Sequence, residues 1–158
     1  MSDSDLMAIA TYLKDLPPAA RKPHNRPVLE WQMRAGEAIF TDTCSACHGP
    51  DGTGVPGLFP SLQANAAVQS RDPTTLVRII LGGTRAVPTP ARPTPVGMPS
   101  FAWKLNDDEV AAVATFVRNS WGNSAPAVSL AKVAKLRRSL AHAATSAANP
   151  VPPGTRNP

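Results

Sequence analysis

The pattern of hydrophobic and polar residues predicts a chain that is mostly helical. Apolar residues recur at helical spacing in four stretches, at about residues 1–16, 30–43, 72–82 and 105–121. The last stretch opens with Asn106-Asp107-Asp108-Glu109, a capping residue followed by acids near the positive end of the helix dipole. Before it, five prolines within residues 88–99 forbid helix and disfavour sheet, so we expect this segment to be extended.

The first and last of these stretches resemble each other. Their apolar stripes are Leu6, Ile9 and Leu13 in one, and Val110, Val113 and Val117 in the other. Aligned from Met1 and Leu105, the two stretches share four identical residues, and several further positions exchange like for like. We therefore expect residues 1–16 to be the closing helix of a preceding domain, in a chain that continues upstream of Met1. Two unrelated amphipathic helices are the alternative.

Two flanking segments differ in composition from the central region. Residues 17–29 are rich in Pro, Arg, Lys and Asn without helical or strand period, which predicts an interdomain linker. Residues 123–158 are expected to form a basic amphipathic segment at 128–140 and then a disordered tail from Ala143. The basic segment fits an anionic membrane surface, a groove on a partner, or solvent. Its cations are Lys132, Lys135, Arg137 and Arg138.

Composition narrows the class of protein. A chain of 158 residues with 42% hydrophobic content allows one small domain with appendages. Aromatic residues make up only 5%, so a large buried cofactor would replace much of the missing apolar volume. The net charge of +5 favours an acidic partner or an anionic lipid surface. Nucleic acid is not expected, because the cations are not interleaved with aromatics and no nucleic-acid-binding signature is present.

The stretch Cys44-Ser45-Ala46-Cys47-His48 carries the chemistry. Two thiols three positions apart, followed at once by an imidazole, are the attachment signature of c-type haem. Each thiol can form a thioether with a haem vinyl group, and His48 is then the proximal ligand of the iron. A thioredoxin-like redox pair, half a zinc site and two unrelated cysteines are the alternatives. They are weaker, because no strand precedes the motif and no third cysteine completes a zinc site.

Residues on both sides of this motif suit the same cofactor. Gly36 in the preceding helix suggests a close helix crossing, with an incidental glycine as the alternative. The Gly-rich stretch after His48 lacks the ending of a phosphate loop and is interpreted as a loop around the haem edge. Pro60 offers a carbonyl to the imidazole N–H of His48, and Leu62 would pack on the haem ring. Met98 is the best-placed thioether for the distal position, with a plain core methionine as the alternative.

Together these residues resemble a class I cytochrome c. In that family a glycine eight residues and an aromatic four residues before the first cysteine lie at a helix crossing, and here they are Gly36 and Phe40. The family's Pro-x-Leu matches Pro60 and Leu62, and its methionine ligand matches Met98. The resemblance covers about residues 30–122. It implies an all-α fold, a small helical domain wrapped around one covalent haem c, with metal ligands His48 and Met98.

A narrower likeness rests on Arg92-Pro-Thr-Pro, Met98-Pro-Ser-Phe-Ala-Trp and Phe116-Val-Arg-Asn-Ser-Trp-Gly-Asn. These look like the last haem domain of the multihaem cytochrome c subunit of membrane-bound alcohol and gluconate-type dehydrogenases. The likeness implies electron transfer from a quinoprotein or flavoprotein dehydrogenase subunit, through upstream haem domains, towards ubiquinone or a downstream redox protein. It implies no catalysis by this chain alone. A free-standing carrier to a terminal oxidase and a haem enzyme or sensor with a displaceable methionine are the alternatives.

The expected location follows from the attachment chemistry. Haem is attached to c-type cytochromes outside the bacterial cytoplasm, so we expect this chain on the periplasmic side of the cytoplasmic membrane. Residues 1–16 are acidic and have neither the basic nor the apolar region of an export signal. The signal is therefore expected on a longer precursor. Peripheral membrane contact is expected through residues 128–140.

Overall fold

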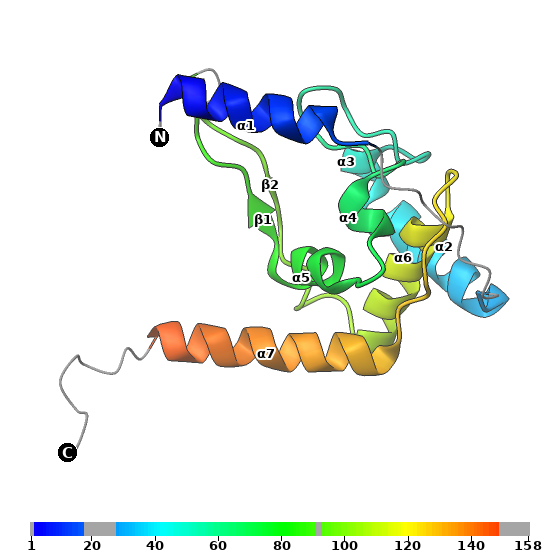
Figure 1. The fold of residues 1–158 in the computed structure, drawn as a ribbon. Coiled ribbons are helices and arrows are strands. Elements are labelled where there is room, and N and C mark those ends of the chain that lie inside the picture. Colours follow the sequence, from blue (N-terminus) through cyan, green and yellow to red (C-terminus); the bar gives the residue numbers. More distant parts are fainter. Residues whose placement is uncertain (1, 18–27, 91–92, 149–158) are drawn as a thin grey trace, which may run out of the picture.

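A computed structural model describes residues 2–17, 28–90 and 93–148, without the side chains of 146–148 (Figure 1). Most of the predicted linker, with His24, lies outside the described residues, as do Arg92 and residues 149–158. The regular elements of the described part are helices and one two-stranded ladder, joined by loops, which agrees with the predicted all-α class. Its elements are α1 (Asp3–Asp15), α2 (Glu30–Thr43), α3 (Ser45–His48), α4 (Ala66–Gln69), α5 (Thr74–Gly82), β1 (Thr84–Arg85), β2 (Gly97–Met98), α6 (Asp107–Asn119) and α7 (Leu130–Ala148).

The fold is centred on the crossing of α2 and α6. A Cβ atom on Gly36 would lie 2.3 Å from the carbonyl oxygen of Ala112 and 2.6 Å from Cβ of Phe116. Only glycine allows the two helices to approach this closely, so the predicted close crossing at Gly36 is confirmed. The rings of Phe40, Phe116 and Trp121 pack beside it, with centroids 4.9 to 5.6 Å apart. The crossing thereby fixes the end of α2, where the cysteine motif begins.

The helix α6 begins with the predicted cap and is buried along its length. The Asn106 side chain accepts a hydrogen bond from the Glu109 N–H (3.0 Å), and the Glu109 carboxylate accepts one from the Asn106 N–H (2.8 Å). Every residue from Val110 to Arg118 is buried. Short α5 adds an apolar face to the same core, formed by Leu76, Val77, Ile80 and Leu81.

The start of α5 differs in detail from the expectation. Residues Asp72 and Pro73 were expected as N-cap and first helical residue, but Pro73 is itself the N-cap. The carboxylate of Asp72 instead accepts hydrogen bonds from the backbone N–H (3.0 Å) and the hydroxyl (2.7 Å) of Thr74. The predicted cap interaction of Asp72 is therefore made, while the helix itself begins one residue later than the sequence suggests.

The proline-rich segment returns to the domain as a short hairpin. Strands β1 and β2 pair antiparallel, with Thr84 opposite Met98 and Arg85 opposite Gly97. All five prolines lie outside the two strands, so none removes a donor from the ladder. The sequence predicted extended backbone here, and the structure adds a ladder of two residues per strand.

The C-terminal helix α7 corrects two expectations. It continues to Ala148, so residues 143–148 are helical and not the start of a disordered tail. The Ala-rich composition of this stretch explains the difference, because alanine has the highest helix propensity. The apolar side of α7 also has a partner already, since Val133 and Leu136 are buried in the domain's own core. That part of the apolar side is therefore not free, whereas Leu130 on the same side is 49% exposed, and contact of residues 128–140 with a membrane stays a prediction.

The N-terminal stretch forms the predicted helix, α1, but the apolar side of this helix is not packed into the core. Ser2 and Asp5 form a capping box, the same arrangement as Asn106 and Glu109 in α6. Its apolar side chains Leu6, Ile9 and Leu13 are 47%, 48% and 60% exposed, and α1 buries no residue. The structure therefore supports the likeness of α1 and α6 in sequence and cap but does not reproduce the burial of α6. Its origin in a preceding domain remains a prediction.

Polar side chains attach the segment after α6 to the core. Arg118, which is fully buried, donates to the carbonyl oxygens of Val68 (2.8 Å) and Pro126 (2.9 Å). The hydroxyl of Thr115 accepts a hydrogen bond from the Val128 N–H (2.9 Å). These contacts fix the segment that joins α6 to α7. Among the described residues, no helix has both the length and the apolar content needed to cross a bilayer.

Candidate haem-binding site

The two cysteines and His48 lie on one turn of helix at the end of α2. Cys44 ends α2 and precedes α3, which contains Cys47 and His48. The carbonyl oxygen of Cys44 accepts hydrogen bonds from the N–H groups of Cys47 (3.2 Å) and His48 (3.0 Å). Because residues three and four apart share a helix face, this turn brings the two thiols and the imidazole together. Neither thiol is in a disulfide.

The environment of Cys44 is unlike that of a reactive thiol. Burial raises the pKa of Cys44 to about 11, and the nearby positive charge of Lys104 offsets this only in part. A redox-active cysteine needs the opposite shift, since the thiolate is the nucleophile. In the described part of the chain, no group of three or more His, Cys, Asp or Glu side chains could hold a metal ion. The structure therefore favours neither the thioredoxin-like nor the zinc interpretation.

The orientation of His48 is set by the loop that follows it. Its Nδ1 atom lies 3.1 Å from the carbonyl oxygen of Pro60, and because a carbonyl can only accept, Nδ1 carries the proton and donates. The hydrogen bond predicted between these two residues is confirmed. In the neutral imidazole, donation through Nδ1 leaves Nε2 as the atom that can bind a metal.

Two glycines shape this loop. Gly54 has a φ of +70°, and a Cβ atom there would lie 2.4 Å from the carbonyl oxygen of Phe59. Its N–H donates to the carbonyl oxygen of His48 (2.7 Å). Gly52 has a φ of +71° and lies against the Trp121 ring, where a Cβ atom would come within 2.6 Å. Glycine is required at both positions for conformation and for space.

Asn123 connects the loop to the rest of the domain, and sequence reasoning missed its role. Its side chain donates to the carbonyl oxygens of Leu62 (3.0 Å) and Val117 (2.9 Å). The amide oxygen accepts from the Ala64 N–H (3.1 Å) and from the Gln69 side chain (2.9 Å). One sequence signal could have indicated this role: Asn123 ends the stretch Phe116–Asn123, which resembles the dehydrogenase cytochrome c subunits. Leu62 is thereby fixed, half-buried against the core.

Met98, the predicted distal ligand, lies on another part of the chain. It lies in β2, half-buried and packed against the core. Gly83, with a φ of +71°, allows the two chain segments to approach, since a Cβ atom there would lie 2.6 Å from the Met98 carbonyl oxygen. Met98 also borders an open hollow lined by residues 82–85 and 97–99. An incompletely enclosed thioether fits a ligand better than a plain core methionine.

The residues present suit haem. Two thiols, an imidazole with Nε2 free and a thioether are the donor set of a c-type haem protein. The segments that contain His48, its loop and Met98 leave large apolar side chains exposed, as haem contacts require. These are Val55, Leu58 and Val96, with 43%, 47% and 37% exposure. His48 and Pro60 are joined by a hydrogen bond, Leu62 is bonded to Gly52 and Asn123 in the same loop region, and Met98 belongs to a separate hairpin on the same core.

Comparison with known proteins identifies the family. Residues 33–121 match the family model of cytochrome c. The chain is 38% identical over 159 residues to the cytochrome c subunit of a quinone-dependent alcohol dehydrogenase from Gluconobacter oxydans, covering 94% of this chain and 33% of that protein. It is 38% identical over 153 residues to the gluconate 2-dehydrogenase cytochrome c subunit of Pantoea cypripedii, covering 87% and 34%. The chain thus spans about a third of these relatives. It belongs to the cytochrome c family, whose members bind haem c covalently.

Proposed function

We propose that this member of the cytochrome c family binds one haem c, with His48 and Met98 as axial ligands, and transfers single electrons within a dehydrogenase complex. The observation that carries the proposal is the helical turn Cys44–His48, in which Pro60 fixes the imidazole with Nε2 free. The bound haem supplies reversible one-electron chemistry at its iron.

Each side chain of the site has a distinct task. The thiols of Cys44 and Cys47 would hold the haem covalently, each through a thioether to one of its two vinyl groups. His48 binds through Nε2, and its hydrogen bond to Pro60 increases its basicity. Met98 presents a soft thioether, which favours the ferrous state and raises the potential. Leu62 packs against the ring and keeps water out.

The partners follow from the relatives. The alcohol and gluconate dehydrogenase cytochrome c subunits support a dehydrogenase subunit as electron donor. Ubiquinone or a downstream redox protein then accepts the electrons, with upstream haem domains in between. We place the reaction on the periplasmic side of the cytoplasmic membrane, where haem c is attached. Methionine on the distal side disfavours the alternative of a haem enzyme, which needs an open coordination position.

Haem stoichiometry and attachment test the proposal. We would express the chain behind an export signal in a strain that matures cytochromes c, and measure the mass of the denatured protein. One covalent haem per chain is expected, and the Cys44→Ala and Cys47→Ala variants should each retain only one thioether. A ferrous holoprotein that does not bind carbon monoxide supports the carrier over the enzyme. Ready binding of carbon monoxide, or no covalent haem, would overturn the proposal.

A further inference from the structure

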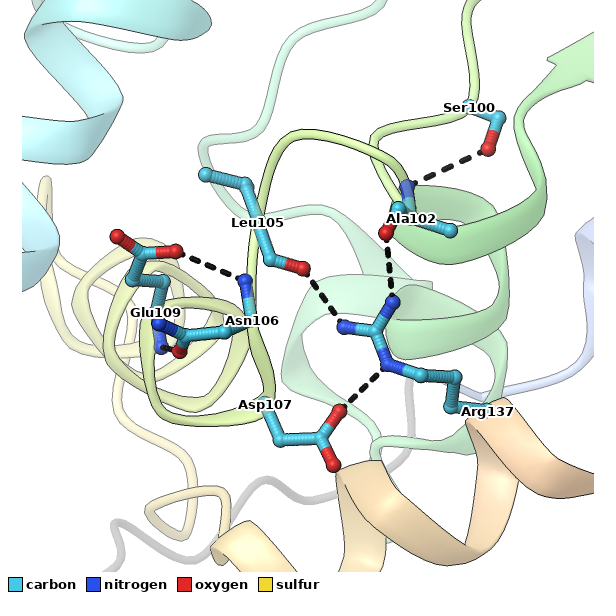
Figure 2. A network of polar contacts seen from close by, with 7 residues as sticks. All are labelled: Ser100, Ala102, Leu105, Asn106, Asp107, Glu109 and Arg137. Atoms are coloured by element: carbon cyan, nitrogen blue, oxygen red, sulfur yellow. Dashed lines mark hydrogen bonds and ion pairs between the residues drawn. The ribbon is translucent and has the colours of Figure 1, made fainter.

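Arg137 lies on α7, beyond residues 33–121 that match the family model, and its guanidinium contacts the start of α6 and the loop before it. Its Nε donates to the Asp107 carboxylate (2.6 Å) at the start of α6. Its Nη1 and Nη2 donate to the carbonyl oxygens of Ala102 (2.8 Å) and Leu105 (2.7 Å). Figure 2 shows the guanidinium between these groups. Both charged side chains are only 27 to 28% exposed, so solvent screens the ion pair incompletely.

The two carbonyl groups belong to the loop that joins Met98 to α6. We call residues 99–106 the distal loop. Its first half is attached to α5, because the Ser100 hydroxyl donates to the Leu81 carbonyl oxygen (2.6 Å) and the Phe101 N–H donates to that of Ile80 (3.0 Å). Arg137 attaches its second half. The segment that follows Met98 is therefore fixed at both ends.

The middle of the distal loop has little packing of its own. Trp103 is 82% exposed, and Ala102 is also exposed. Lys104 is exposed too and forms an ion pair with Asp42 (3.1 Å), which solvent screens more than the pair of Arg137 and Asp107. A segment with few buried apolar contacts opens easily, so its position depends on its polar anchors. The arginine is suited to this task, because its planar guanidinium donates in several directions at once. Lysine could keep the ion pair with Asp107 but could not span the two carbonyl groups.

We propose that Arg137 is a positioning residue that holds the distal loop so that the Met98 thioether stays on the haem iron. The inference rests on the proposed ligation by His48 and Met98. It gives the C-terminal helix α7 a function beyond covering the core: it controls how easily another ligand displaces Met98. In the absence of the Arg137 contacts, the loop keeps its bonds at Ser100 and Phe101, the buried Leu105 and the exposed Lys104–Asp42 ion pair, but the Ala102 and Leu105 carbonyl groups lose their donor. Met98 then leaves the iron more readily.

Displacement of Met98 by imidazole tests the proposal in the ferric holoprotein. Its readout is the loss of the weak absorption band near the red end of the spectrum that marks iron–sulfur bonding. In the Arg137→Ala variant, the imidazole concentration that displaces half of the Met98 ligand should be about tenfold lower. A change of this size is what the loss of one charge-assisted hydrogen bond produces. Arg137→Lys should restore part of the difference. Far-ultraviolet circular dichroism checks that α7 remains folded in each variant.

The matched control is Lys132→Ala. Lys132 also lies on α7 and forms an ion pair with Asp72 (2.9 Å), at a place that does not touch the distal loop. This variant should bind imidazole like the original protein. An equal shift in Lys132→Ala, or no shift in Arg137→Ala, overturns the positioning role. If Arg137→Ala does not fold, the imidazole titration is made with Arg137→Lys and Asp107→Asn, and no shift in either variant overturns the positioning role.

A further variant separates this inference from the proposed ligation. Met98→Leu should lose the red-end band before any imidazole is added. If the band persists in Met98→Leu, the ligation itself is wrong. If Met98→Leu loses the band while both Arg137 variants titrate like the original protein, only the role of Arg137 is wrong.

Discussion

The two sides of the proposed haem site are built differently. His48 is fixed by its own helical turn and by Pro60, only twelve positions away, in a loop shaped by glycines. Met98 lies in a hairpin of two residues per strand, and its distal loop is held by α5 and by Arg137 of α7. The proximal ligand thus has local support, whereas the distal ligand depends on contacts between distant segments. Ligand exchange is therefore expected on the distal side.

The largest effect is expected from a change that removes the common support of both sides. Gly36→Val places a branched side chain where a Cβ atom alone would lie 2.3 Å from the Ala112 carbonyl oxygen. The helices α2 and α6 must separate, which we expect to cost about 3 kcal/mol or more of the free energy of unfolding. Gly82→Ala is the control, because its Cβ atom would meet nothing within 4 Å. Equal urea midpoints for the two variants would contradict the crossing.

A smaller effect is expected on the proximal side alone. Asn123→Ala removes the donor from the buried carbonyl oxygen of Val117 and from the half-buried one of Leu62, which should cost about 2 to 3 kcal/mol. Urea unfolding measures this loss. Because the distal anchors are untouched, the imidazole concentration that displaces Met98 should stay unchanged. A shift as large as that of Arg137→Ala would mean that the two sides are not independent.

The cap of α6 tests the end of the distal loop. Asn106→Ala removes the hydrogen bond to the Glu109 N–H and should lower the free energy of unfolding by about 1 kcal/mol. Ser2→Ala makes the same change in α1, which buries no residue, so it should leave the unfolding midpoint unchanged. A clear loss of stability in Ser2→Ala would show that α1 contributes to the folded domain after all.

The smallest effect concerns acid stability far from both ligands. Hydrogen bonds from Thr74, and then the contact with Lys132, lower the pKa of Asp72 from 3.8 to about 2. A lowered pKa in the folded state contributes stability above pH 3.8, and this contribution is lost as the pH falls towards 2. Asp72→Asn should therefore flatten the unfolding profile in this window. A profile identical to that of the original protein would show that the Asp72 contacts do not form in solution.

The sequence predicted the proximal side well because its signals are local. The spacing of Cys44, Cys47 and His48, the carbonyl of Pro60 and the crossing at Gly36 depend on residues close in sequence or on one glycine. The contacts of Asn123 and Arg137 could not be predicted, because their partners lie on other elements. The resemblance to the dehydrogenase cytochromes drew attention to Asn123 without indicating its partners, and nothing in the sequence around Arg137 indicates its role. The amphipathic pattern of a helix likewise does not indicate its packing partner. It predicts that a helix has an apolar side, but α7 buries that side and α1 exposes it.

The ferric absorption spectrum tests the central claim, that His48 and Met98 together hold the haem iron, most directly. The holoprotein should be low-spin, with the weak red-end band of an iron–thioether bond. Met98→Leu, which conserves volume but removes sulfur, should lose the band, whereas Met33→Leu, a change in the core-packed methionine of α2, should retain it. A high-spin spectrum of the original holoprotein, or an unchanged band in Met98→Leu, would contradict the account.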